Sequence, residues 1–497
     1  MKKSNIFKLL LVCMVMVLIV VLVLSYSRST PDGEVVSTTG QKETEAEEYD
    51  DPSESDDPLI IFKPDYDGYA FTFLVQDYKD EQYNLVSECK SSYVLPDAVY
   101  RRNKILKDKY NINFELMRVT DLVATVRTQV LGGACSFDMI IGDGRKLAAL
   151  AKENLLYDLS AVKYFDMTKS YWDSNAAEQL KIYDKLYFTN CDINVSEFGN
   201  VVYFNKQLIV DYDLTSPYEY LENNQWTLDN WASLVMAVSD NIDGESPWDD
   251  VWDEYDIYGT TYEFRNTAMF MYGAGIRATA NDGNGGLKVT LYDTDKTESV
   301  FNRCKAVFST ANTWCIDDMS SNNDIKAKYR YARSLFCQDH YLFYYDGTRI
   351  IDEFKDMESE FGMIPFPKYD SSQSEYCTLY PHDGYLVAVP KVVEDIERTG
   401  KIIEDLNFYS SIIVKPAWYD VLLSRRYTRD EESEEYMKLM YENRVYDLGL
   451  IYDFGGLRTN FLEKDARTFD MTERNFKRAL RNNVEAYIKQ TYREIES

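Results

Sequence analysis

Polar residues that could hold a hydroxyl-rich ligand stand at the ends of the predicted strands of this chain. They are carboxylates, amides and small residues that follow or directly precede short apolar runs: Gln76, Asp77, Asp143, Gly144, Asn190, Asp192, Asn194, Tyr345, Asp346, His382 and Asp383. In open α/β sheets ligands bind beyond the carboxyl ends of the strands, and such groups form paired hydrogen bonds to neighbouring hydroxyls. Each Asp could equally cap a helix or close a turn. Their shared placement is what favours a binding site.

Other motifs that carry chemistry are incomplete here. Residues 142–146, GDGRK, lack the spacer and the Lys-Ser/Thr ending of a phosphate loop. Residues 239–250 match a calcium loop at Asn241, Asp243 and Gly244 but not at its first and last positions, so a solvated acidic loop is the favoured interpretation. The chain has two histidines and no GxSxG, so nothing in the sequence supports a Ser-His-Asp triad. We therefore expect no metal, no cofactor and no catalytic residue, although 83 acidic residues could hide a glycosidase pair.

The charge balance of the chain excludes whole classes of partner. The 497 residues include 54 Lys and Arg against 83 Asp and Glu, a net charge of −29. Nucleic acids and anionic membrane surfaces need clustered cations, so neither is expected as a partner. An anionic solute is disfavoured unless basic residues gather locally. The 41 tyrosines suit hydroxyl-rich ligands, because a ring stacks while its OH hydrogen-bonds.

The N-terminal segment has the pattern of an export signal. Three lysines precede the apolar run Leu9–Leu24, which is followed by polar residues. A cleaved signal, an uncleaved anchor and a lipoprotein modified at Cys13 remain alternatives. Residues 31–58 hold eleven acidic residues against one lysine and almost no large apolar residues, which predicts a disordered linker. The seven other cysteines have no metal or CxxC spacing, and we interpret them as free thiols, with one or two disulfides as the alternative.

Alternating strands and helices must position the candidate residues. Residues 69–76, 111–119 and 137–141 predict strands, and the stretches between and after them predict helices. This order implies right-handed βαβ units and a mainly parallel sheet. Further strands are predicted at 185–190, 201–205, 341–345, 362–367 and 385–390, with helices dominating from residue 392 onward.

Several stretches, in their order and spacing, resemble the carbohydrate-type solute-binding proteins of ABC importers (family 1, maltose-binding-protein-like). The resemblance covers most of residues 70–455. It is carried by FDMIIGDG at 137–144, LAALAKENLLYDLS at 147–160, SYWDSNAAEQLKIYDKLYFTNCDIN at 170–194, VVYFNKQLI at 201–209, WTLDNWASLVMAVSD at 226–240, FGMIPFPKYDSSQSEY at 361–376, GYLVAVP at 384–390 and YENRVYDLGLIYDFG at 441–455. The chain departs from the pattern in lacking a lipoprotein Cys at the end of the signal.

The resemblance implies a two-lobed α/β fold of the type II periplasmic-binding-protein kind, with a mainly parallel sheet in each lobe. Residues 59–195 and 345–386 would form lobe one, and 196–344 and 387–497 lobe two. Hinge crossings are expected near 194–199, 341–346 and 384–389, and closure of the lobes would sequester the ligand. Relatives stack an aromatic residue of the second lobe on the sugar, which makes Trp226 and Trp418 candidates and Trp172 and Trp314 weaker ones. Core packing is the alternative for each, and Trp231 is assigned to the core from its helical face.

The predicted function is capture of a small solute, favouring a mono- or oligosaccharide, for delivery to ABC permease subunits. The protein would be a monomer at the outer face of the cytoplasmic membrane, tethered or released. A surface receptor or scaffold of the same fold and an exported glycoside hydrolase remain alternatives, and a peptide solute stays open.

Overall fold

A computed structural model describes residues 64–77, 84–88, 90–91, 93–195, 199–242, 255–291, 295–319, 325–423, 432–468 and 474–496. All of them lie within one compact unit that begins at Lys63. The predicted export signal, the acidic linker and positions 243–250 of the candidate calcium loop lie outside the described residues. None of the helices that the structure describes is both long and apolar enough to cross a membrane.

The first lobe contains the predicted βαβ units. Its sheet has the order β13-β3-β1-β2 and is built from β1 (Tyr69–Gln76), β2 (Ile112–Val119), β3 (Met139–Asp143) and β13 (Tyr385–Ala388). The connecting helices are α2 (Val94–Tyr110), α3 (Leu122–Leu131) and α4 (Gly144–Lys152). Strands β2 and β3 run parallel to β1, and only β13 is antiparallel. Asp121 caps α3 by accepting from the backbone N–H of Ala124, which fixes the start of that helix.

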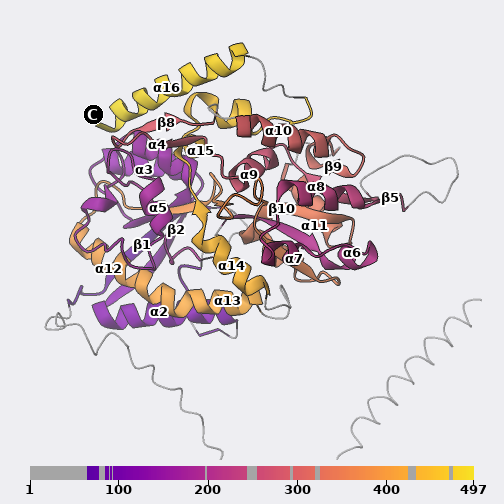
Figure 1. The fold of residues 1–497 in the computed structure, drawn as a ribbon. Helices are drawn as coiled ribbons and strands as arrows, with labels where there is room; N and C mark the ends of the chain where they lie inside the picture. The colour runs from indigo at the N-terminus through magenta and orange to yellow at the C-terminus, as the bar shows by residue number, and fades with distance from the viewer. Residues whose placement is uncertain are drawn as a thin grey trace, which may run out of the picture. The chain divides into compact units, whose positions relative to one another are not determined.

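The second lobe is built on a mixed sheet, which corrects the expectation of a mainly parallel one. Its order is β11-β4-β10-β6-β5 with β9 beside β6, from β4 (Asn200–Asn205), β5 (Ser239–Asp240), β6 (Ile257–Tyr262), β9 (Thr313–Cys315), β10 (Tyr341–Gly347) and β11 (Phe361–Ile364). β4 lies between β10 and β11 and is antiparallel to both. The reason is that the chain enters this lobe along β4 and returns toward the entry point along β10. In Figure 1 the elements of the first sheet group at one side and those of the second sheet at the other.

The lobe boundaries also differ from those predicted. Strand β11 belongs to the second sheet, so residues 345–364 are not in lobe one. The chain returns to the first lobe only between β11 and β13. Helix α12 (Ile396–Tyr409) then stays with that lobe, because the hydroxyl of Tyr110 in α2 donates to Asp405 at 2.5 Å. The predicted strand 185–190 is absent: Thr189 forms only an isolated bridge to Val387.

A C-terminal segment joins the two lobes. Strand β14 (Arg444–Val445) pairs with β12 (Thr378–Leu379), which lies on the crossing between the lobes. Arg444 forms an ion pair of 2.6 Å with Asp173 of the first lobe. Asp447 accepts from the hydroxyl of Tyr272 in the second lobe at 2.7 Å. These contacts hold the C-terminal segment, residues 444–463, at the junction of the lobes, so that Leu450 lies there.

The remaining elements cover the two sheets and the junction. They are α5 (Ser174–Gln179), α6 (Lys206–Asp211), α7 (Pro217–Glu222), α8 (Leu228–Ala237), α9 (Asn266–Gly273), β7 (Thr279–Asn281), β8 (Leu287–Val289), α10 (Asp295–Phe308), α11 (Ile325–Phe336), α13 (Lys415–Leu423), α14 (Glu432–Glu442), α15 (Leu448–Ile451) and α16 (Arg474–Glu496), with the short helices η2 (Leu159–Ala161), η3 (Ile316–Asp318), η4 (Thr348–Phe354), η5 (Ser410–Val414), η6 (Phe454–Gly456) and η7 (Arg458–Leu462). Figure 1 shows α16 lying over α4 and β8. The six cysteines within the described ranges carry free thiols.

Candidate functional site

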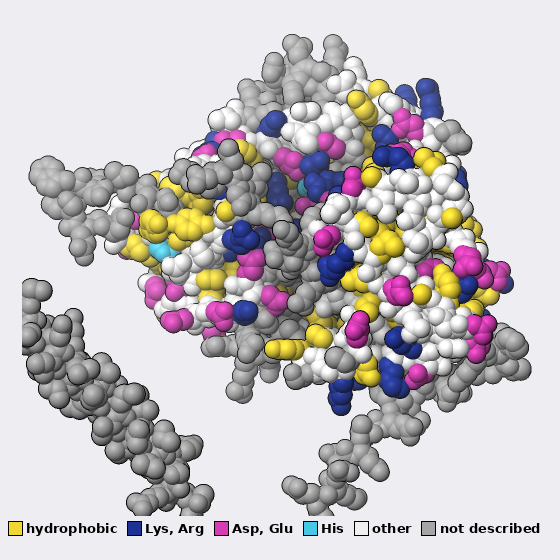
Figure 2. Space-filling view, turned by 180° about the vertical axis from the view of Figure 1, so that it is seen from behind, with side chains coloured by type: hydrophobic (Ala, Val, Ile, Leu, Met, Phe, Trp, Pro, Cys, Tyr) yellow, Lys and Arg dark blue, Asp and Glu magenta, His cyan; other side chains and the backbone are white. Residues whose placement is uncertain are grey.

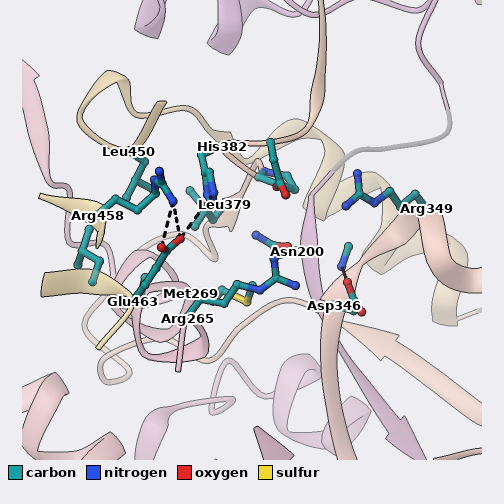
Figure 3. A pocket seen from close by; sticks show the side chains of 15 residues that line it. Asn200, Arg265, Met269, Asp346, Arg349, Leu379, His382, Leu450, Arg458 and Glu463 are labelled. Carbon is teal, nitrogen blue, oxygen red and sulfur yellow. Dashed lines mark hydrogen bonds and ion pairs between the residues drawn. The ribbon is translucent and has the colours of Figure 1, made fainter. Parts of the chain in front are cut away.

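A pocket lies where the two lobes and the C-terminal segment meet. It holds about 480 Å³ of empty space, counting the part that is open to solvent. Its walls are formed by Asn200, Arg265, Ala268, Met269, Asp346, Gly347, Arg349, Leu379, Pro381, His382, Asp383, Leu450, Arg458, Leu462 and Glu463 (Figure 3). The sequence-predicted residues Asp346, His382 and Asp383 are among them.

Strand ends place the pocket residues of each lobe. In the second lobe, Asn200 at the start of β4 is paired with Gly347 at the end of β10, so the amide and Asp346 lie at the same sheet edge. In the first lobe, His382 and Asp383 precede β13. That strand pairs with β3, and the backbone N–H of Gly144 donates to the carbonyl of Gly384 at 3.1 Å. The prediction that binding residues lie next to the ends of strands therefore holds for both walls of the pocket.

Charged side chains of the first lobe converge at the pocket rim. Asp143 caps α4 by accepting from the backbone N–H of Arg145 at 2.8 Å, and an Arg145 Nη2 lies 2.5 Å from Asp143 Oδ2. The same nitrogen is 3.9 Å from Asp383 Oδ2. Gln76 Oε1 accepts from Lys146 Nζ at 2.9 Å. Arg145 thus links Asp143 with Asp383, whereas Gln76 contacts Lys146 outside the pocket lining and Asp77 is exposed beyond β1.

The second-lobe wall is an arginine and carboxylate network. Arg333 Nη2 lies 2.8 Å from Asp346 Oδ2, and the backbone N–H of Gly347 donates to Asp346 Oδ1 at 2.8 Å. Burial acts to raise the pKa of Asp346, but Arg333 and Arg265 outweigh it and lower that pKa. Arg265 pairs with buried Glu263, whose pKa is raised by burial. Asp346 is therefore ionised at neutral pH.

His382 contributes no charge to the pocket at neutral pH. Burial lowers the pKa of its imidazole to about 3. Its Nε2 lies 3.6 Å from Oε1 of Glu463, and Arg458 Nη1 lies 3.0 Å from that oxygen (Figure 3). Burial also opposes ionisation of Asp383, but His382 and nearby arginines outweigh it and lower the pKa of that carboxyl. Three arginines and three carboxylates then line the pocket around a neutral imidazole.

Asn190, Asp192 and Asn194 are not in the pocket lining, which corrects their predicted placement. Lys415 Nζ lies 2.9 Å from Asp192 Oδ1, and the Asn190 amide donates to the hydroxyl of Tyr446 at 2.9 Å. The Asn194 amide donates to a backbone carbonyl at 2.6 Å. The reason is that Tyr446 and Lys415, from the C-terminal part of the chain, satisfy Asn190 and Asp192, while the carbonyl of Tyr385 satisfies Asn194.

The aromatic candidates are buried instead of facing the pocket. Trp226 is 0% exposed and its indole N–H donates to the carbonyl of Pro365 at 2.8 Å. Tyr345 points into the second-lobe core, opposite to its neighbour Asp346, and its hydroxyl accepts from Trp231 at 2.8 Å. Trp418 is also buried, on α13. Among the described residues that line the pocket there is no Trp, Tyr or Phe, so Trp226 and Trp418 do not face it in this structure, while the core assignment of Trp231 is confirmed.

Gly144 touches the pocket wall without lining it. A Cβ built on Gly144 would meet the carbonyl oxygen of His382 at 2.9 Å, so the absence of a side chain lets α4 begin directly beside the loop 381–383. Any larger residue would push that loop away.

Sequence reasoning missed most of the basic residues of the pocket. Arg265 directly precedes α9, and Arg458 and Glu463 come from the C-terminal segment, whose path over both lobes has no local sequence signal. Asn200 and Arg349 do have a signal. Asn200 begins a predicted strand, and Arg349 comes two residues after Gly347, where another one ends.

Comparison with known proteins relates this geometry to solved structures. No family model matches the sequence, and no curated protein matches it. UspC of M. tuberculosis matches with a TM-score of 0.55 at 14% identity, over 84% of this chain and 100% of that one. A sugar transporter protein of Rhizobium etli in an open conformation matches with a TM-score of 0.53 at 15% identity, over 86% of this chain and 100% of that one.

A third match has a sugar in its structure. The galacto-N-biose/lacto-N-biose I-binding protein of a Bifidobacterium longum ABC transporter, in complex with lacto-N-biose, has a TM-score of 0.53 at 12% identity, over 86% of this chain and 96% of that one. The chain has the two-lobed solute-binding-protein fold. In this fold the pocket described above occupies the junction of the two lobes, and both of its lobe walls are strand ends.

Proposed function

We propose that this chain is an extracytoplasmic solute-binding protein that captures a small carbohydrate between its lobes and delivers it to an ABC permease. One observation carries the proposal: Asn200 and Asp346 of the second lobe and His382 and Asp383 of the first line the same pocket. A ligand that contacts both walls binds one arrangement of the lobes better than others and so shifts their equilibrium.

The pocket chemistry suits a polyhydroxylated molecule. A hydroxyl both donates and accepts, and the lining offers donors from Arg265 and Asn200 together with the acceptor Asp383. Met269 and Leu450 provide apolar surface for the C–H face of a ring. The solved structures of the same fold that contain lacto-N-biose and, in a Listeria monocytogenes ABC substrate-binding protein, cycloalternan support a carbohydrate.

The pocket residues are better suited to binding a sugar than to hydrolysing one. A glycosidase acid is a carboxyl whose pKa is raised so that it can donate a proton. The pKa values of Asp346 and Asp383 are instead lowered by neighbouring arginines. Burial lowers the pKa of His382 to about 3, which makes its imidazole a weak base at neutral pH.

We further propose that the protein is exported and held at the outer face of the membrane, or released there, by its N-terminal segment. Permease subunits would be its partners and a monomer its working form. A receptor or scaffold without a transport role is the competing function. Genes for two permease subunits beside this one would favour carriage, whereas a histidine kinase gene would favour the receptor.

A thermal-shift screen of the full-length protein tests the proposal. The panel contains mono- and oligosaccharides, peptides and polyamines, and a ligand at 100 times its dissociation constant should stabilise the fold by about 2.7 kcal/mol. We expect one sugar class to raise the Tm and to be recovered intact. Asn200→Ala should lose the shift, while the matched Asn223→Ala on the exposed end of α7 should keep it. No response to any sugar would contradict a sugar carrier, and conversion of the sugar would identify an enzyme.

A further inference from the structure

We propose that the captured sugar is acidic, and that its carboxylate is bound at the side of the pocket lined by Arg265 and Arg349, where Arg145 lies beside the lining residue Asp383. This inference rests on the proposed function, because it specifies the solute of the same site. It runs against the overall charge of −29, which on its own would favour a neutral or cationic solute.

Arg145 and Arg265 are more exposed than the carboxylates Asp143 and Glu263 that hold them, while Asp383, 21% exposed, lines the same side. The side chain of Arg145 is 42% exposed, whereas its partner Asp143 is 4% exposed. Arg265 is 29% exposed, and its partner Glu263 is 4% exposed. A ligand entering the pocket therefore meets guanidinium N–H groups first. Because Coulomb energy falls with distance, the nearer cation outweighs the anion behind it.

The cations also converge on one point. Arg145 Nη2 lies 3.9 Å from Asp383 Oδ2, and Arg265 and Arg349 line the pocket beside that carboxylate. The electrostatic field of all three acts on Asp383. Arg349 is itself exposed, directly after β10 and Gly347. In Figure 2, Lys and Arg side chains gather around a hollow on one face of the molecule.

The opposite side of the pocket is less basic, so the two ends of a bound ligand would meet different chemical groups. There the carboxylate is the more exposed partner, since Glu463 is 25% exposed and Arg458 13%. His382, Leu450 and Leu462 lie on the same side. In Figure 3, Arg458, Glu463 and His382 stand together, apart from Arg349 and Asp346. This side suits the hydroxyls and the apolar face of a sugar ring, and the arginine side suits an anionic group.

Guanidinium is the side-chain group best matched to a carboxylate. Its planar fork forms two parallel hydrogen bonds to one carboxylate, and charge-assisted bonds are roughly twice as strong as neutral ones. Solvent ions screen the remote surface acids over a Debye length of about 8 Å at physiological salt. The local arrangement, and not the net charge, therefore sets the preference.

Matched sugars that differ only in charge test the inference. Binding of the full-length protein to hexuronic acids, the corresponding neutral hexoses and the hexosamines is measured by calorimetry, with disaccharides of each kind alongside. We expect a uronic acid to bind at least about tenfold more tightly than its neutral counterpart. That advantage should shrink between low and high salt, while neutral-sugar affinity stays constant. Sulfated or phosphorylated sugars that bind more tightly still would support an anionic solute and reassign its acidic group.

The two proposals fail in different ways. If neutral sugars bind as tightly as the uronic acids, or more tightly, the acidic-sugar inference is overturned and the carrier function stands. If no sugar of any charge binds, the carrier function itself fails.

A charge-matched pair of variants locates the effect. Arg349→Gln removes an exposed cation of the pocket, and should bring the affinity for the uronic acid to within about threefold of that for the neutral sugar. Arg101→Gln removes a cation of α2 that is 57% exposed and outside the pocket lining, and should leave the preference unchanged. Both residues are exposed, so both variants should fold with an unchanged Tm. A preference that survives Arg349→Gln and also Arg145→Gln would contradict the proposed arginine site.

Discussion

Arg444 and Asp173 form an ion pair of 2.6 Å in which each side chain is only 3% exposed. The pair fastens strand β14 of the C-terminal segment to the first lobe. The hydroxyl of Tyr446, the residue after β14, donates to the same carboxylate at 2.5 Å, so Asp173 is held by two neighbouring residues of the C-terminal segment.

Removing this arginine should destabilise the protein strongly. Arg444→Met leaves the Asp173 carboxylate buried without its cation, and breaking such a pair costs about 3–5 kcal/mol. Urea unfolding followed by circular dichroism measures the loss. Arg101→Met, in an exposed pair with Asp97, is the control and should cost at most about 1 kcal/mol. Equal losses in the two variants would show that the C-terminal segment is not fastened as described.

The crossing between the lobes depends on Gly199. Its φ is +153°, and a Cβ at this position would clash with the side chain of Thr378 in β12. Gly199→Ala should therefore cost about 2 kcal/mol or more, through overpacking added to backbone strain. Gly133→Ala is the matched control, because its φ is +80° but nothing lies within 4 Å of the added Cβ, and it should cost about 1 kcal/mol. Thermal unfolding compares them, and a Gly199 variant as stable as the control would exclude close contact between the crossing segments.

His382 should make the protein acid-sensitive. The pKa of its imidazole falls from 6.5 to about 3 in the folded state, so the unfolded chain binds a proton that the folded chain does not. Stability from this group is intact above pH 6.5 and is lost as the pH falls toward 3, with a slope of about 1.4 kcal/mol per pH unit. We expect His382→Gln to flatten the acid limb of a stability-against-pH curve by this amount. Identical slopes for wild type and variant would show that the imidazole is not held neutral.

Trp226 should matter for stability and not for sugar affinity. Trp226→Phe removes a hydrogen bond to Pro365 and leaves space in the core, which should cost about 2 kcal/mol. The dissociation constant of the folded fraction should stay within about twofold of wild type. Denaturation and calorimetry on the same preparation separate the two effects. A tenfold loss of affinity without a loss of stability would restore Trp226 as a sugar-contacting residue.

The first lobe could be predicted from the sequence because its signals are local. Strand β1 is a mostly apolar run rich in aromatic and β-branched residues, and helix α3 begins with its own cap at Asp121. The second sheet could not be ordered in the same way, because β4, β10 and β11 are adjacent through contacts between residues more than a hundred positions apart. The predicted lobe boundary therefore differs from the observed one, because the sequence of β11 is compatible with a strand of either sheet.

Half of the site was predictable for a similar reason. Asp143 and Asp346 stand at the ends of predicted strands and Asp383 directly before one, and a position next to a strand can be read from the sequence. Arg458 and Glu463 depend on how the C-terminal segment crosses both lobes, which no spacing reveals. Residue type alone could not place the tryptophans. A tryptophan can stack on a sugar or pack in a core, and the burial of Trp226 and its hydrogen bond to the Pro365 carbonyl are visible only in the structure.

Hydrogen–deuterium exchange of the full-length protein, with and without the most stabilising sugar of the screen, tests the central claim most directly. If the pocket between the lobes binds the sugar, amides of residues 264–269, 347–350 and 381–384 should become protected together, since they come from both walls of one site. Protection confined to one lobe, or at surfaces away from these three segments, would contradict capture between the lobes.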